Sequence, residues 1–197
     1  MAQAPRFIHL RTHSEYSLLE GALRLKKLPD LCKSAGMPAM ALTDTNNMFA
    51  ALEFSVAMAG AGVQPIIGCQ VDLAYVTVQP GEKPRDPAPV VLLAQSEAGY
   101  ENLMKLNSCL YIDKGGALPQ VTLEELEALN SGLICLTGGA GGPVGQLLQG
   151  GQRPAAEALM ARLHGAFADR LYVELQRHPG EDGQPLARPK CMRPMMR

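Results

Sequence analysis

Short apolar runs alternate with segments of helical spacing along most of this chain, and this alternation constrains the fold more than any other feature of the sequence. Apolar runs predict strands at residues 7–10, 39–43, 65–75, 90–94, 133–136 and 171–175. Strands that alternate with helices through short connections are typical of parallel βαβ units. We therefore expect an α/β fold, either an open doubly wound sheet or a β/α barrel of the TIM type.

Capping residues mark the expected ends of most helices. Gly36 is placed to end the first helix, because glycine readily adopts the left-handed conformation found there. Ser96 can cap the helix after the fourth strand, and Thr122 with Glu125 forms a capping box before another. Pro154 suits the first turn of the last helix.

The second helix is expected to follow a polar segment that carries a candidate catalytic group. Asn46 or Asn47 can cap this helix, and Phe49, Leu52 and Val56 recur on one face, which we expect to be buried. Asp44, just upstream, could ligate a metal or act as a base, but helix capping is the favoured interpretation.

Two glycine-containing connections exclude common nucleotide sites. The first expected strand leads into RTHSEYSLLEGA, which has no G-x-G-x-x-G, so a Rossmann dinucleotide site is not predicted. Residues 137–145, TGGAGGPVG, lack the G-K-[ST] ending of a phosphate loop and are interpreted as a flexible turn. Residues 77–88, VTVQPGEKPRDP, form the clearest loop.

The charge distribution and the cysteine content indicate which cellular compartment and which classes of partner suit this chain. The formal net charge is −1, but four basic residues lie in the last ten positions, so the remaining chain is acidic and does not suit general nucleic-acid binding. Five widely spaced cysteines, the absence of a signal peptide and the absence of a membrane-length apolar run favour a cytoplasmic protein without a membrane partner.

Polar side chains cluster at the expected strand ends, where β/α barrels carry their chemistry. His9, Arg11 and His13 alternate, and an H-x-x-x-H pair can begin a metal site or can be a polar strand end beside solvent. His178 directly follows the last expected strand. Cys135 lies within an apolar run and is interpreted as a core residue, whereas His164 is expected on an exposed helix face.

Five blocks of sequence, in order, resemble the start of bacterial DNA polymerase III alpha subunits. The blocks are HLRTHSEYSLLEGA (9–22), MPAMALTDTNNMF (37–49), QPIIGCQV (64–71), GYENLMKL (99–106) and RLYVELQRH (170–178). The resemblance implies a PHP domain, a distorted β/α barrel, over residues 1–186. The barrel is expected to be incomplete at its C-terminal end, and residues 187–197 form a basic tail without family character, expected to be disordered.

The same resemblance implies that a metal site has been lost. His13 and Glu20 match ligand positions of active PHP domains, and Asp44 lies nearby. Arg11, Thr45 and Gln70 stand where histidine, histidine and glutamate are expected. A guanidinium does not deprotonate, so Arg11 places a fixed cation where metals would sit, and we expect it to pair with Glu20 or Asp44. No metal and no catalytic residue are predicted for this chain.

The resemblance also implies a function. We interpret the chain as a fragment of a replicative polymerase whose PHP domain is a scaffold for the proofreading exonuclease subunit and other holoenzyme subunits. The full polymerase would use Mg²⁺ and bind primer-template DNA through palm carboxylates that this chain lacks. The alternative is a stand-alone, metal-dependent PHP phosphoesterase, which would need the missing ligands.

Overall fold

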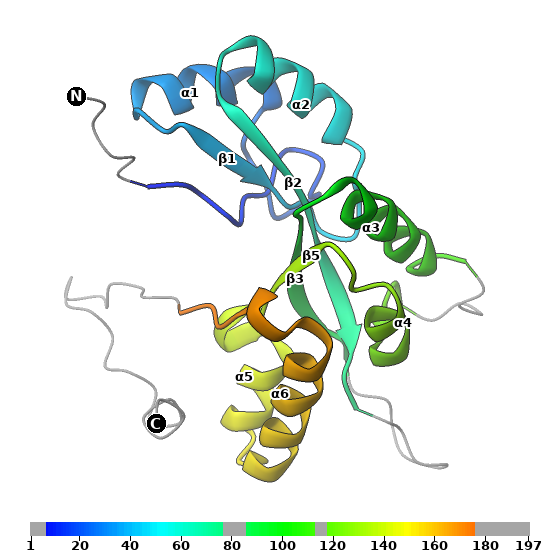
Figure 1. The fold of residues 1–197 in the computed structure, drawn as a ribbon. Helices are drawn as coiled ribbons and strands as arrows, with labels where there is room; N and C mark the ends of the chain where they lie inside the picture. The colour runs from blue at the N-terminus through cyan, green and yellow to red at the C-terminus, as the bar shows by residue number, and fades with distance from the viewer. Residues whose placement is uncertain (1–6, 77–85, 113–117, 176–197) are drawn as a thin grey trace, which may run out of the picture.

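The computed structural model describes residues 7–76, 86–112 and 118–175, which form a curved, open sheet with helices packed against it (Figure 1). The strands are β1 (Ala39–Leu42), β2 (Gln64–Ala74), β3 (Ala88–Ala94), β4 (Val121–Thr122), β5 (Leu133–Leu136) and β6 (Leu171–Tyr172). The α-helices are α1 (Leu28–Ser34), α2 (Ala51–Gly60), α3 (Glu97–Cys109), α4 (Leu123–Ala128), α5 (Pro143–Gln149) and α6 (Arg153–Phe167). Three 3-10 helices complete the set, namely η1 (Leu25–Lys27), η2 (Gly139–Gly141) and η3 (Ala168–Arg170). The expectations for His178 and for residues 187–197 lie outside the described residues.

The sheet has the order β1-β2-β3-β5-β6, with β4 paired to β2, so the predicted α/β class is correct. The expectation of parallel units throughout is wrong, because β3 runs antiparallel to both β2 and β5. The sequence between β2 and β3 is rich in proline and reads as a loop, and antiparallel strands can be joined without a crossover helix. Within the described ranges the sheet does not close, and β1 and β6 are its edges.

The predicted first strand, residues 7–10, is not a strand in the structure. This segment runs beside β1 and makes one backbone hydrogen bond to it, from Ala41 N to His9 O at 2.8 Å. Phe7 and Leu10 are exposed on it. A ladder needs repeated pairing, and one bond does not sustain it. The predicted last strand is likewise shortened, from residues 171–175 to β6.

Side chains alternate between the two faces of the sheet, as the pleat requires. On the outer face Leu92 and Cys135 are fully buried beneath α3 to α6, in the largest apolar cluster. On the inner face the neighbouring Leu93 and Leu136 form a separate, smaller cluster. A third cluster joins β1 to α1, α2 and Val63. The outer face therefore holds the main core.

Helix α2 has a different start and a different buried face from those predicted. Its N-cap is Ala50, which makes no side-chain cap, so neither Asn46 nor Asn47 caps it. Phe54 and Met58 are buried, whereas Phe49, Leu52 and Val56 point outward. The helix starts later than the asparagines suggested, and both stripes are apolar, so periodicity alone did not identify the buried one.

The predicted helix ends are confirmed at three positions, whereas the predicted turn at residues 137–145 is not. Gly36 has φ +64° just after α1, Ser96 accepts from Gly99 N, and the Thr122–Glu125 capping box is formed in both directions. Residues 137–145 contain η2 and the start of α5 rather than a flexible turn, so the interpretation there was wrong. None of the helices in the described ranges has the length and hydropathy that a membrane span requires.

Candidate functional site

Five residues singled out in the sequence come together at one end of the inner face. Arg11 and His13 lie on the segment beside β1, Glu20 on the loop that follows it, Thr45 just after β1, and Gln70 within β2. A parallel bridge between Thr45 and Gln70 joins the segment after β1 to the interior of β2. The cluster borders a hollow of about 550 Å³ beside α1. The structure thus places these five residues in one cluster.

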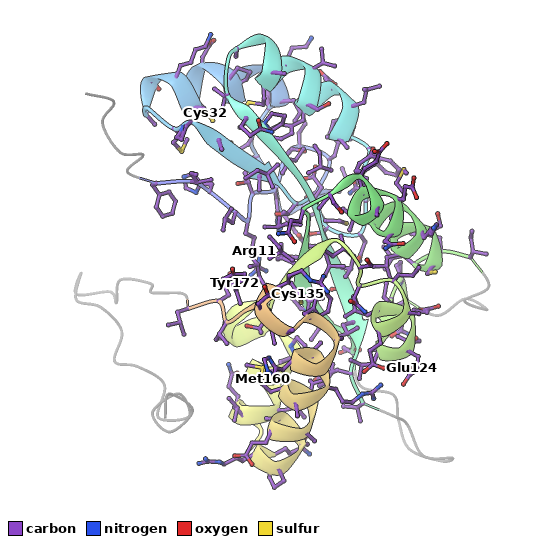
Figure 2. All side chains as sticks on the ribbon, viewed as in Figure 1. Arg11, Cys32, Glu124, Cys135, Met160 and Tyr172 are labelled. Carbon is purple, nitrogen blue, oxygen red and sulfur yellow. The ribbon has the colours of Figure 1, made fainter. Side chains whose placement is uncertain are left out.

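The guanidinium of Arg11 holds the centre of this cluster. Its Nε and Nη2 donate to Gln70 Oε1 at 3.1 and 2.7 Å. Its Nη1 donates to Glu174 Oε1 at 2.9 Å and reaches Gly138 O at 3.5 Å. Both members of the ion pair are mostly buried, with side-chain exposures of 24% and 16%. Figure 2 shows Arg11 in the middle of the molecule, near Tyr172 of β6.

A chain of hydrogen bonds extends from Gln70 to Glu20. Gln70 Nε2 donates to Thr45 Oγ1 at 3.1 Å, and the Thr45 hydroxyl donates to Glu20 Oε2. His13 lies between these groups, with Nε2 3.2 Å from Gln70 Oε1 and Nδ1 3.4 Å from Glu20 Oε2. The polar groups that would face a metal therefore bond to one another.

Asp44 lies next to the cluster but faces away from it. It is 2% exposed and accepts hydrogen bonds from Ser14 N, Ser14 Oγ and Ser17 Oγ at 2.6 to 2.7 Å. The favoured capping interpretation is wrong, because these donors belong to the loop after the N-terminal segment and not to a helix. Asp44 anchors residues 14–17 onto the end of β1.

Glu174 is the member of the site that sequence reasoning missed. We expected Arg11 to pair with Glu20 or Asp44, and the structure pairs it with Glu174 instead. Glu174 N also donates to Thr137 Oγ1 at 3.1 Å, which holds the residue beside β5. The available signal was a single acidic residue within the apolar LYVEL run, where a buried carboxylate needs a cation.

This donor set does not fit the metal cluster that the resemblance implies. Gln70 offers a neutral amide whose oxygen already accepts from Arg11, and Thr45 offers a hydroxyl in place of an imidazole. A fixed guanidinium repels divalent cations. Across the described ranges, no group of three or more His, Cys, Asp or Glu side chains is placed to hold a metal ion.

Burial disfavours the charged forms of two titratable side chains beside the cluster, Asp72 and Cys69. Burial raises the pKa of Asp72, and the charge of Glu20 raises it further, against the lowering effect of a hydrogen bond from Asn46. Burial also raises the pKa of Cys69 to about 12, so its thiol is not a nucleophile.

The remaining candidates from the sequence lie away from the cluster. His9 is exposed and meets Phe7 edge to face, with ring centroids 4.7 Å apart. Cys135 is fully buried in the core, and His164 is exposed on α6, as expected.

Comparison with known proteins finds DNA polymerase III alpha subunits among the relatives of this chain. The DNA polymerase III subunit alpha of Caulobacter vibrioides is 44% identical over 179 residues, covering 90% of this chain and 16% of that protein. Those of Borreliella burgdorferi and Pseudomonas fluorescens are 34% and 36% identical over 92% and 90% of this chain. This chain spans 14–16% of the length of such relatives.

A solved structure and a family model complete the comparison. An amidohydrolase from Chromobacterium violaceum aligns with 93% of this chain at a TM-score of 0.47 and 16% identity, a likeness too distant to carry an argument. The model of the PHP domain family matches residues 9–178. This match covers all three described ranges almost completely and includes every residue of the Arg11 cluster. The chain belongs to the PHP domain family.

Proposed function

We propose that this chain serves as the N-terminal PHP domain of a replicative DNA polymerase III alpha subunit and acts there as a non-catalytic scaffold. The identities of 34–44% to proteins of that name, over about nine-tenths of this chain, support the assignment. DNA synthesis with Mg²⁺ on primer-template DNA would belong to other parts of such a polypeptide.

The observation that carries the non-catalytic role is the position of Arg11. Its guanidinium bonds Gln70 and Glu174 at the point where the ligand positions of the family converge. A hydrolytic metal site needs anionic or neutral donors with free lone pairs. Here the guanidinium of Arg11 already bonds two such donor atoms, Gln70 Oε1 and Glu174 Oε1. The site then stabilises the fold instead of activating water.

The scaffold would hold the proofreading exonuclease subunit and other subunits of the polymerase in the cytoplasm. Family resemblance is the basis for this partner. Four described cysteines are free, three of them buried, which suits a reducing compartment. Such a domain contributes surface and rigidity while the chemistry occurs elsewhere.

Metal content and hydrolysis test the proposal together. We expect the purified chain to carry no stoichiometric Zn, Mn or Fe after dialysis and to hydrolyse no generic phosphomonoester. Retained metal with ester turnover that His13→Ala abolishes would establish the alternative, a PHP phosphoesterase. His164→Ala is the matched control, because His164 is exposed on α6, outside the cluster.

Co-purification tests the partner. We expect the exonuclease subunit from the same organism to bind the chain in a pull-down with purified components. Lack of binding at micromolar concentration would remove the exonuclease from the proposal.

A further inference from the structure

Six exposed apolar side chains gather beside the Arg11 cluster, and we name them the mouth patch. They come from the loop before η1, from the segment just before α2 and from the turn just after α3. The members are Tyr16, Leu18, Leu19, Phe49, Tyr111 and Ile112, with exposures of 39, 83, 107, 74, 55 and 61%.

Hydrogen bonds between the three segments make the mouth patch one surface. Asn47 Nδ2 donates to Tyr16 O at 3.2 Å, which joins the loop to the segment before α2. Tyr111 Oη donates to Asn46 O at 2.7 Å, which joins the end of α3 to the same segment. Beyond Phe49, the exposed Leu52 extends the apolar surface along α2.

The loop that carries two of the leucines is held firmly in an unusual conformation. Leu19 has φ +67°, a region that non-glycine residues rarely adopt, and its side chain points fully outward. Asp44 fixes the loop through Ser14 and Ser17. A Cβ on Gly21 would stand 1.9 Å from Ser14 O, so the loop closes tightly. A fixed, outward leucine on a strained backbone is typical of a functional surface.

The surroundings of the mouth patch are acidic. No lysine, arginine or histidine occurs from residue 34 to residue 82, or from 14 to 23, and α3 carries one lysine, Lys105, against Glu97 and Glu101. Glu15 and Glu20 lie in the loop, and Glu53 lies on α2 one turn after Phe49, all three exposed. Asp72 approaches from β2 through its hydrogen bond with Asn46. Glu20 and Asp72 are close enough to repel each other, since the charge of Glu20 adds to burial in raising the pKa of Asp72.

We propose that the mouth patch docks a segment of a partner protein that presents apolar side chains flanked by lysine or arginine. Apolar contact supplies the affinity and the acidic rim selects the charge of the partner. A second copy of this chain would bring the same acidic rim and be repelled, and so would the phosphates of lipids or nucleic acids. The proposal rests on the scaffold function and deepens it by naming the surface and the chemistry of the partner.

A pair of designed peptides tests the chemistry on the whole 197-residue chain. Both peptides carry the same amphipathic leucine pattern, one with lysine and one with glutamate at the polar positions. Fluorescence anisotropy should show saturable binding of the lysine peptide, at least about tenfold tighter than that of the glutamate peptide. Equal binding of the two would overturn the proposal.

Substitutions locate the binding on the surface. Leu19→Ser and Phe49→Ser should each weaken the lysine peptide by about tenfold, and Glu53→Lys by a smaller factor. Leu118→Ser and Glu101→Lys are matched controls at exposed positions outside the patch and should change nothing. Circular dichroism establishes that each variant is folded. Folded patch variants that bind as tightly as the unmodified chain would overturn the assignment of the surface.

Binding of the exonuclease subunit to the patch variants tests the docking surface and the scaffold function separately. Loss of its binding in the patch variants would support both. Exonuclease binding that Leu19→Ser and Phe49→Ser leave unchanged would overturn the mouth patch and keep the scaffold function. Peptide binding at the patch without exonuclease binding would keep the surface and overturn the exonuclease as partner.

Discussion

The two faces of the sheet are built from the same strands but are covered very differently. On the outer face, helices α3 to α6 bury every large side chain of β3 and β5 that points toward them. On the inner face, Ile66 and Ile134 are only partly buried, and a hollow of about 720 Å³ lies between them, Phe7 and Tyr172. Most of the buried apolar packing therefore lies on the outer face, while the polar cluster lies at one end of the inner face.

The inner face is bounded by two segments with few backbone bonds. Residues 7–11 lie along one side and residues 172–174 along the other, and both line the hollow. The Arg11–Glu174 ion pair joins them across 163 positions of sequence. The guanidinium of Arg11 therefore connects the first and last described parts of the chain.

Amide hydrogen exchange should show the largest expected difference, between a central strand of the sheet and a segment at its border. The amides of Val90–Ala94 lie in a strand paired on both sides and should exchange only through global unfolding. Those of Phe7–Leu10 should exchange almost freely. The difference in opening free energy should be on the order of 5 kcal/mol, the lower limit for a stable domain. Equal, strong protection of both segments in a monomer would contradict this picture.

Matched truncations on the two faces should differ in cost. Leu92→Ala removes a fully buried outer-face side chain and should lower the free energy of unfolding by about 3 kcal/mol. Ile134→Ala removes an inner-face side chain that already borders the hollow and should cost about 1 kcal/mol. Urea unfolding of both variants measures the difference. Similar losses would mean that the inner face is as well packed as the outer one.

The sequence predicted those features whose physical causes are local. The capping box at Thr122 depends on a four-residue spacing, and β5 is an apolar run with clear ends. The polar residues that follow Leu10 and Leu42 were expected to lie close together, and the bridge between Thr45 and Gln70 places them beside the inner face of β2. The resemblance to PHP domains further implied that some of these residues, such as Arg11 and Gln70, differ from those of a metal-binding set.

The features that were missed depend on tertiary partners. The direction of β3 follows from the connection before it, not from its apolar composition. Residues 7–10 have the composition of a strand but make only one backbone hydrogen bond to β1, from Ala41 N to His9 O. The apolar stripe of α2 that includes Phe49 was expected to be buried, yet the helix buries Phe54 and Met58 instead. Composition describes what a segment can bury, and the rest of the fold decides what it does bury.

The partly buried ion pair at Arg11 should matter more than an exposed one of better geometry. Arg11→Met keeps an unbranched apolar stem but removes the donors to Gln70 and Glu174, and should cost about 2 kcal/mol. Arg162→Met is the control, because Arg162 bonds Glu124 and Glu127 on the exposed surface and should cost about 0.5 kcal/mol. Thermal or urea unfolding compares them, and an equal cost would show that Arg11 contributes only surface electrostatics.

The smallest expected effect concerns the pH dependence of stability at Asp72. Its pKa in the folded chain is raised by burial and by Glu20, so folding favours the protonated carboxyl. Its contribution to stability is therefore largest below the unfolded pKa of about 3.9, falls as the pH rises toward the folded pKa, and is constant above it.

Substitution by asparagine should remove this dependence with little change in structure. In Asp72→Asn the new amide oxygen can still accept from Asn46 Nδ2, and the backbone N–H still donates to Asn46 Oδ1. The variant should be more stable than the original chain near pH 7 by roughly 0.5 kcal/mol, and this advantage should shrink toward pH 4. Urea unfolding of both chains across that pH range measures the difference. An original chain that gains stability relative to Asp72→Asn as the pH rises would mean that the carboxylate is stabilised at the rim, and that the acidic surroundings of the mouth patch are already compensated from within the chain.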